Sequence, residues 1–176
     1  YFHAFSEALA TIYSKEESRI LYRYFLEDFQ ERKVENLTLE FEKGHLIKIN
    51  DQKFSHPSEA IVKLNEIASE FAIGRDTHVG DTIIGIKGRV GFEAAGAILT
   101  LKAHHLLEKH VLSKYQLMIK SQMADWYGTW LHEALFLDPV MRDIEKLMEN
   151  SQQNVTGKVF VTLLPYRFEL NGIESK

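Results

Sequence analysis

The chain has 176 residues, of which 45% are hydrophobic and 26% charged, and its formal net charge is −4 at pH 7. These values are typical of one globular domain, and the lack of basic runs argues against a nucleic-acid surface. The sequence has no cysteine, which excludes disulfides, thiolate metal sites and cysteine nucleophiles. No apolar run approaches the roughly 20 residues of a membrane-spanning helix, and we expect a cytoplasmic protein.

Residues 1–36 predict two amphipathic helices that meet near Ser14, because apolar and aromatic residues recur there at helical spacing. We interpret this helical segment as a hairpin packed on the rest of the domain. A partner surface and a segment acquired by gene joining are the alternatives, so the sequence leaves the origin of these residues open.

In residues 37–51 apolar and polar side chains alternate, and turn-forming residues separate the alternating segments. This pattern predicts a small antiparallel meander. Pro57 then suits the first turn of a helix with one apolar face. This helix should end by Gly74. We interpret these elements as scaffold.

The stretch 72–97 is both glycine-rich and densely charged. We interpret its glycine spacing as too close for a helix or a long strand, and we predict a charged loop that turns often or passes close to a ligand. The charged residues between the glycines are Arg75, Asp76, Asp81, Lys87, Arg89 and Glu93.

Three further helices and a final pair of strands complete the predicted fold. The first helix covers residues 93–112, Ser113 caps the second, which continues towards Leu135, and Asp138-Pro139 begins the third. Apolar residues alternate again between positions 155 and 170. Strands grouped before and after serial helices favour an α+β fold, a small antiparallel sheet packed with several helices, over a doubly wound parallel sheet.

Two candidate reactive clusters have simpler explanations. His104, His105 and His110 lie on one predicted helix without the spacing of a zinc protease site, so we expect no metal and a packed, hydrogen-bonded His104. Asp81 and Glu93 suggest an acid/base pair, but the basic residues nearby should keep both as ordinary anions. We therefore predict no catalytic residue in this chain.

A series of short motifs follows one order from residue 74 onward: Gly74-Arg75, Val79, Gly85, Lys87, Arg89, Phe92-Glu93, Gly96, Ala103-His104, Leu107-Glu108, Trp126-Tyr127-Gly128-Thr129-Trp130, Asp138-Pro139 and Asn154-Val155-Thr156-Gly157-Lys158-Val159. This order resembles the synthetase (carboxy-terminal) domain of argininosuccinate synthase. The resemblance covers about residues 37–176, and we find none in residues 1–36.

The resemblance implies a ligase that joins citrulline to aspartate in arginine biosynthesis. In that family ATP, with Mg²⁺, activates the ureido oxygen as an adenylate and releases pyrophosphate. A separate amino-terminal domain binds the ATP through an S-G-G-[LYM]-D-[TV]-S loop, a string that does not occur here. We therefore expect this chain to be a substrate-binding and assembly domain that binds no ATP and is inactive alone. The resemblance also implies a homotetramer.

Two departures from the family pattern concern citrulline. Gly80 stands where the family has a glutamate that helps to bind the α-amino group, and Phe92 replaces a tyrosine that also contacts citrulline. We predict both as substrate-binding residues. The residues of the supporting loop are Arg75, Asp81, Thr82, Lys87, Arg89 and Glu93.

Loss of a carboxylate opposite an ammonium group makes the pocket poorly suited to free citrulline. One hypothesis is therefore that the complete enzyme prefers an α-N-acylated citrulline, such as the acetyl or the succinyl form. The carboxylate of a succinyl group would need a cation, for which Arg75, Lys87 and Arg89 are near in sequence. The alternative is neutral drift with free citrulline still bound.

The alternative hypothesis is that this chain is a non-catalytic assembly module. The aromatic residues of segment 1–36 and of the helix that carries Trp126 and Trp130 would then bury a subunit interface, where aromatic side chains are favoured anchors. A pyrophosphate loop in the adjoining gene sequence would favour the ligase, and its lack would favour assembly.

Overall fold

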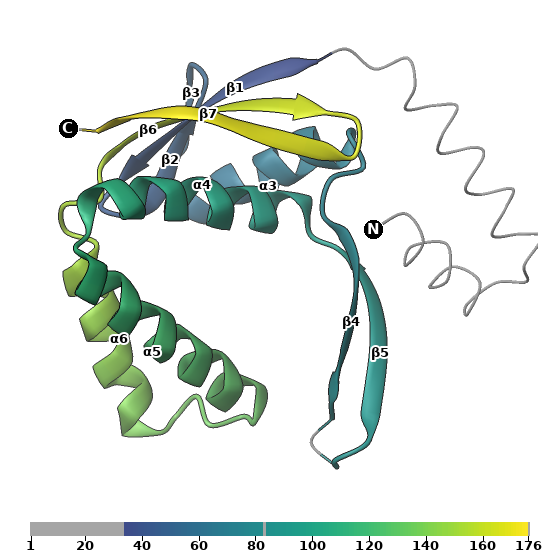
Figure 1. Cartoon of the computed structure of the whole chain (residues 1–176), viewed down its shortest axis with the longest axis vertical. Helices are drawn as coiled ribbons and strands as arrows, with labels where there is room; N and C mark the ends of the chain where they lie inside the picture. The colour runs from purple at the N-terminus through teal and green to yellow at the C-terminus, as the bar shows by residue number, and fades with distance from the viewer. Residues whose placement is uncertain (1–33, 83, 176) are drawn as a thin grey trace, which may run out of the picture.

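The computed structural model describes residues 34–82 and 84–175. Within these ranges the chain folds into a five-stranded sheet, a separate two-stranded sheet and four helices, which confirms the predicted α+β class (Figure 1). Residues 1–33 of the helical segment predicted for residues 1–36 lie outside the described residues, and its last two residues were predicted wrongly. Residue 35 already belongs to the first strand of the large sheet.

The large sheet joins the two ends of the described chain. Its strands run antiparallel in the order β3-β2-β1-β6-β7. They are β1 (Glu35–Glu42), β2 (His45–Ile49), β3 (Gln52–Lys53), β6 (Gly157–Leu164) and β7 (Arg167–Ser175). The predicted meander and the final pair of strands are therefore confirmed, and they meet because β1 pairs with β6, with Leu39 opposite Val159.

The helices begin where local capping signals place them. Pro57 starts α3 (Pro57–Ser69), Ser113 caps α5 (Lys114–His132) and Asp138 caps α6 (Pro139–Ser151), all as predicted. The helix between α3 and α5, α4 (Ala95–Val111), lies within the predicted range 93–112. No described helix is long and apolar enough to cross a bilayer.

The core lies between one face of the sheet and the helices α3 and α4 (Figure 1). Alternate residues of β1 and β6 point into it, because successive side chains of a strand point to opposite faces. The helices contribute apolar residues at spacings of three and four. The fully buried residues from these elements include Leu39, Phe41, Val159, Leu163, Ala60, Leu64, Leu99, Ala103 and Leu107.

The stretch predicted as a charged loop is a β-hairpin, so that prediction was wrong. Its strands are β4 (Arg75–Asp81) and β5 (Lys87–Glu93), and they pair along their whole length. Among the described glycines of the stretch, positive φ angles occur at Gly74 and Gly85, beyond the strand ends. Gly80, Gly88 and Gly91 are accommodated within the ladder, and Gly96 belongs to α4. The cross-strand pairing along the whole ladder thus outweighs the weak strand propensity of glycine.

Two extensions leave the body from the opposite ends of α4. The β4–β5 hairpin ends directly before α4, and α5 with α6 follows it (Figure 1). The neck of the hairpin is narrow, because the Ala94 N–H donates to the Gly74 carbonyl over 2.9 Å. The other extension is loosely packed: α5 has no buried residue, and α6 buries only Met141 and Ile144.

Two helical glycines give a matched test of the packing of α3 against α4. A Cβ on Gly96 would lie 2.7 Å from the Ile61 carbonyl oxygen and from Asn65, whereas a Cβ on Gly128 would meet nothing within 4 Å. We predict that Gly96→Ala lowers the free energy of unfolding by about 1–3 kcal/mol. Gly128→Ala should raise it by about 0.5–1 kcal/mol. Urea denaturation measures both, and equal effects would contradict the close helix crossing.

Candidate functional site

The β4–β5 hairpin presents two chemically different faces, because paired residues share a face and successive residues alternate. The charged face carries Arg75, Thr77, Val79 and Asp81 opposite Glu93, Gly91, Arg89 and Lys87. The glycine face carries Asp76, His78 and Gly80 opposite Phe92, Val90 and Gly88. The hairpin projects from the body, so that most of its residues are exposed (Figure 1).

Ion pairs lock both ends of the charged face. Arg75 Nε lies 3.3 Å from a carboxylate oxygen of Glu93 at the neck, and Lys87 Nζ lies 2.8 Å from Asp81 at the tip. Asp81 and Glu93 are therefore at opposite ends of the hairpin and do not form an acid/base pair. The Lys87–Asp81 pair is exposed and contributes little free energy, whereas the Arg75 side chain is only 14% exposed. Both pairs hold their cations on this face.

Thr82 belongs to neither face and closes the turn at the tip. Its hydroxyl donates to the Ile86 carbonyl over 2.8 Å, and its own N–H donates to the same oxygen over 2.9 Å. Gly85 supplies the left-handed residue of the turn with φ +76°. The contacts of Thr82 therefore serve the turn.

The two predicted substrate residues, Gly80 and Phe92, lie on the glycine face with one residue pair between them. Neither is buried, and the Phe92 side chain is 40% exposed. Gly80 stands directly opposite Gly88, so this pair contributes no side chain of its own to the face. A single hairpin face offers one wall to a small molecule, and the opposite wall must come from elsewhere.

His78 is a residue of this face that the sequence analysis missed. It lies between Gly80 and Phe92 along the ladder, and a Cβ added to Gly80 would collide with Nε2 of His78. The imidazole therefore occupies the space that a side chain at position 80 would need. The two-residue spacing of His78 and Gly80 would have indicated their shared face, had the stretch been predicted as a strand.

A second polar cluster is built around Glu108, a buried carboxylate on α4. Its side chain is 2% exposed and accepts a hydrogen bond from Gln152 Nε2 at 2.7 Å. Lys120 Nζ, from α5, lies 3.0 Å from the same oxygen. These contacts connect α4, the start of α5 and the residue after α6, so the cluster is a structural junction.

His104 completes this junction and fixes the direction of its hydrogen bonds. Gln152 donates to Glu108 through its amide nitrogen, so its amide oxygen must accept from His104 Nε2, 2.8 Å away. The His104 ring also packs on Phe41, with 5.6 Å between ring centroids. The structure thus places His104 as the packed, hydrogen-bonded group that was predicted.

Burial and the neighbouring charges act together on the pKa values of this junction. Burial lowers the pKa of His104 below its ordinary value of 6.5, and the attraction of Glu108 only partly opposes that effect. Burial by itself raises the pKa of Glu108, but the charge of His104 and the contacts with Lys120 and Gln152 bring it below 4.5. Lys120 and Gln152 stabilise the carboxylate also when His104 is neutral.

Removal of the Lys120 ammonium group from this junction should lower the stability of the fold. We predict that Lys120→Met lowers the free energy of unfolding by about 3 kcal/mol, because a buried carboxylate loses its charged partner. The matched control is Lys63→Met, which removes a cation 2.9 Å from Glu66 on the exposed side of α3. Its effect should stay within about 0.5 kcal/mol. Equal effects in urea denaturation would show that the junction contributes no more than a surface pair.

The lowered pKa of His104 predicts the pH dependence of stability. Below pH 6.5 the unfolded chain binds a proton at this histidine before the folded chain does, so the free energy of unfolding should fall as the pH drops. The slope from this group is at most about 1.4 kcal/mol per pH unit. His104→Gln should flatten it, whereas His132→Gln, at the exposed end of α5, should not. Urea denaturation between about pH 7.5 and 5.5 gives the slopes, and equal slopes for wild type and His104→Gln would contradict the burial effect.

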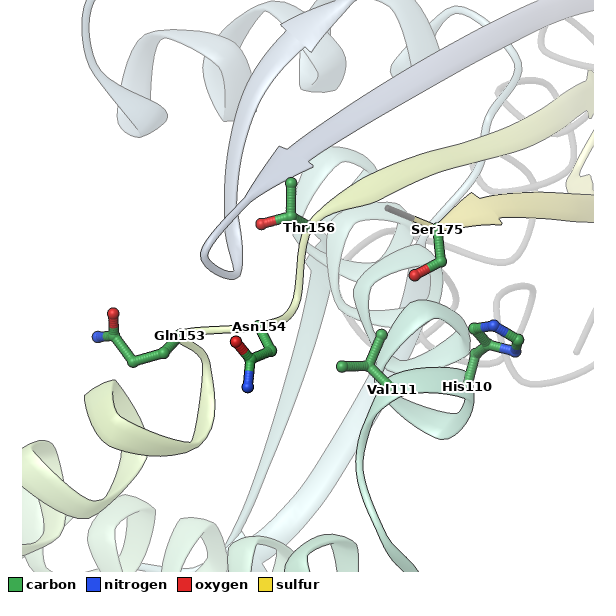
Figure 2. Close-up of a pocket in the computed structure, with 6 residues that line it drawn as sticks. All are labelled: His110, Val111, Gln153, Asn154, Thr156 and Ser175. Atoms are coloured by element: carbon green, nitrogen blue, oxygen red, sulfur yellow. The ribbon is translucent and has the colours of Figure 1, made fainter.

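An open depression lies at the far end of α4 from the hairpin. Figure 2 shows the residues that line it, which come from the end of α4, the segment before β6 and the end of β7: His110, Val111, Gln153, Asn154, Thr156 and Ser175. None of the predicted site residues lies there. In the described ranges, no group of three or more metal-binding side chains is assembled either.

A profile of the family described as arginosuccinate synthase C-terminal domain matches residues 11–176. The chain belongs to this family. The predicted resemblance is thus confirmed. The match also includes residues 11–36, in which the sequence analysis found no likeness.

Proteins named argininosuccinate synthase are similar to this chain. The one from Methanocaldococcus jannaschii is 35% identical over 143 residues, which are 81% of this chain and 36% of that protein. The one from Dictyoglomus thermophilum is 34% identical over 86% of this chain and 38% of its own length. The one from Xanthomonas campestris is 37% identical over 70% of this chain and 31% of its own length. The chain therefore spans about a third of the length of these relatives.

Proposed function

We propose that this chain is the substrate-binding and assembly domain of an argininosuccinate synthase, a ligase of arginine biosynthesis in the cytoplasm. Family membership supports the proposal, and so does the share of the relatives that the chain spans. The observation that carries it is the exposed glycine face, on which Gly80 and Phe92 lie together. Such a face has the form of one wall of a site that another domain closes.

The proposed reaction has two nucleophilic steps. The ureido oxygen of the citrulline substrate attacks the α-phosphorus of ATP and pyrophosphate leaves; the aspartate amine then attacks the ureido carbon and AMP leaves. ATP with Mg²⁺ would be held by the nucleotide-binding domain, a further part of the complete enzyme. This chain would contribute position and exclude water, which is how oriented binding accelerates such steps. Alone it should bind no ATP and be inactive.

The glycine face supports an α-N-acylated citrulline as the substrate. Position 80 offers no carboxylate for an ammonium group, and position 92 offers an apolar ring without a hydroxyl. The competing possibility is free citrulline, for which Asp76 is the carboxylate of this face. Asp76 is paired with Phe92 and lies four residues from Gly80, so it cannot replace a carboxylate at position 80 directly.

Substrate selectivity tests this proposal in the complete enzyme. We predict that kcat/KM for N-acylcitrulline exceeds that for citrulline, and that Gly80→Glu with Phe92→Tyr raises the value for citrulline by about tenfold or more. The control Phe160→Tyr adds a hydroxyl to another exposed phenylalanine and should change neither value. A wild-type preference for free citrulline would end the acyl proposal. Absence of pyrophosphate release with every substrate would end the ligase proposal.

A second candidate function, a non-catalytic oligomerisation module, has its own support in α5. Much of the apolar surface of this helix is exposed, and Trp126 packs beside Trp130 with 5.9 Å between ring centroids. Exposed aromatic and aliphatic side chains in one region favour a protein interface. In the ligase the same surface would serve assembly, and a homotetramer is the form that we propose. A gene without a pyrophosphate loop would favour the second candidate.

A further inference from the structure

The glycine face has a different charge from the face behind it. Its only charged or titratable residues are Asp76 and His78, and the other four positions are glycine or apolar. The basic residues Arg75, Lys87 and Arg89 all belong to the charged face. A substituent that lies on the glycine face therefore meets one carboxylate, one imidazole and apolar surface.

The cations are also held away from the glycine face. Arg75 is tied to Glu93 and Lys87 to Asp81 by ion pairs of 3.3 and 2.8 Å. Arg89 is paired with Val79 in the ladder, on the same side as both ion pairs. These residues therefore do not provide the partner that the carboxylate of a succinyl group would need.

His78 is the polar group that the glycine face presents next to position 80. Its ring fills the space above Gly80, so Nε2 lies next to the backbone of that residue. An imidazole N–H donates hydrogen bonds, and the carbonyl oxygen of an amide accepts them. The neighbouring Val90 and Phe92 offer apolar contact, which suits a methyl group.

We propose that the substituent on the α-nitrogen of the substrate is short and uncharged, of the acetyl class, and that His78 donates a hydrogen bond to its carbonyl oxygen. This inference rests on the proposed function. It makes His78 a specificity-determining residue that takes the place of the absent side chain at position 80. A succinyl group is disfavoured because its carboxylate would share the face with Asp76 and find no permanent cation there.

The test compares kcat/KM of the complete enzyme for N-acetylcitrulline, N-succinylcitrulline and citrulline. The wild type should prefer the acetyl over the succinyl substrate by at least about tenfold. His78→Ala should lower the value for the acetyl substrate about fivefold and leave citrulline within about twofold. His78→Gln, which keeps an N–H donor, should recover most of this loss. His78→Lys should raise the value for the succinyl substrate, because it adds a cation to the face.

The collision between position 80 and the imidazole adds a second readout. Gly80→Ala displaces His78, so it should lower the acetyl preference as His78→Ala does, and the double variant should lose no more than either single variant. Val79→Thr, an exposed change of similar size on the charged face, is the control and should keep wild-type selectivity.

The outcomes separate this inference from the proposed function. An active enzyme that uses the succinyl substrate as well as the acetyl one overturns the inference and leaves the ligase intact. The same holds if His78→Ala lowers all three values equally, because that result would indicate a general effect on the hairpin. An enzyme that ligates none of the three substrates overturns the proposed function, and this inference falls with it.

Discussion

The pairing of β1 with β6 is the constraint on which the rest of the structure depends. It brings the first described strand beside one that lies more than a hundred residues later and joins a meander and a hairpin into one sheet. That sheet has one continuous apolar face, and α4 covers it with Leu99, Ala103 and Leu107. Because α4 is fixed in this way, the direction in which both extensions leave its ends is fixed too.

The two ends of α4 are stabilised by different interactions. At its carboxyl end the chain buries a carboxylate and satisfies it with Lys120 and Gln152, so the junction with α5 and α6 is costly to break. At its amino end the chain extends a hairpin that is held mainly by its own ladder and by ion pairs at the neck and tip. Most residues at this second end are exposed, so they can change without repacking the core.

Features that depend on neighbouring residues could be predicted from the sequence, whereas features that depend on residues far apart in the sequence could not. Helix starts at Pro57, Ser113 and Asp138 depend on a few neighbouring residues, and all three are correct. The hairpin was missed because its stability comes from partners across the ladder, which a reading of glycine spacing does not include. The junction was seen only in part: His104 and Glu108 belong to one helix, whereas Gln152 lies 44 residues beyond Glu108 and joins it only in the folded chain.

The narrow neck of the hairpin has a consequence for how its length can vary. Both strands enter and leave the core at Gly74 and Ala94, so extra residues at the tip do not disturb the packing below. Two more residues in each strand would extend its reach by about 7 Å and keep every side chain on its present side. One more residue in each strand would exchange the sides at the tip. Insertions that keep the two faces as they are should therefore add an even number of residues to each strand.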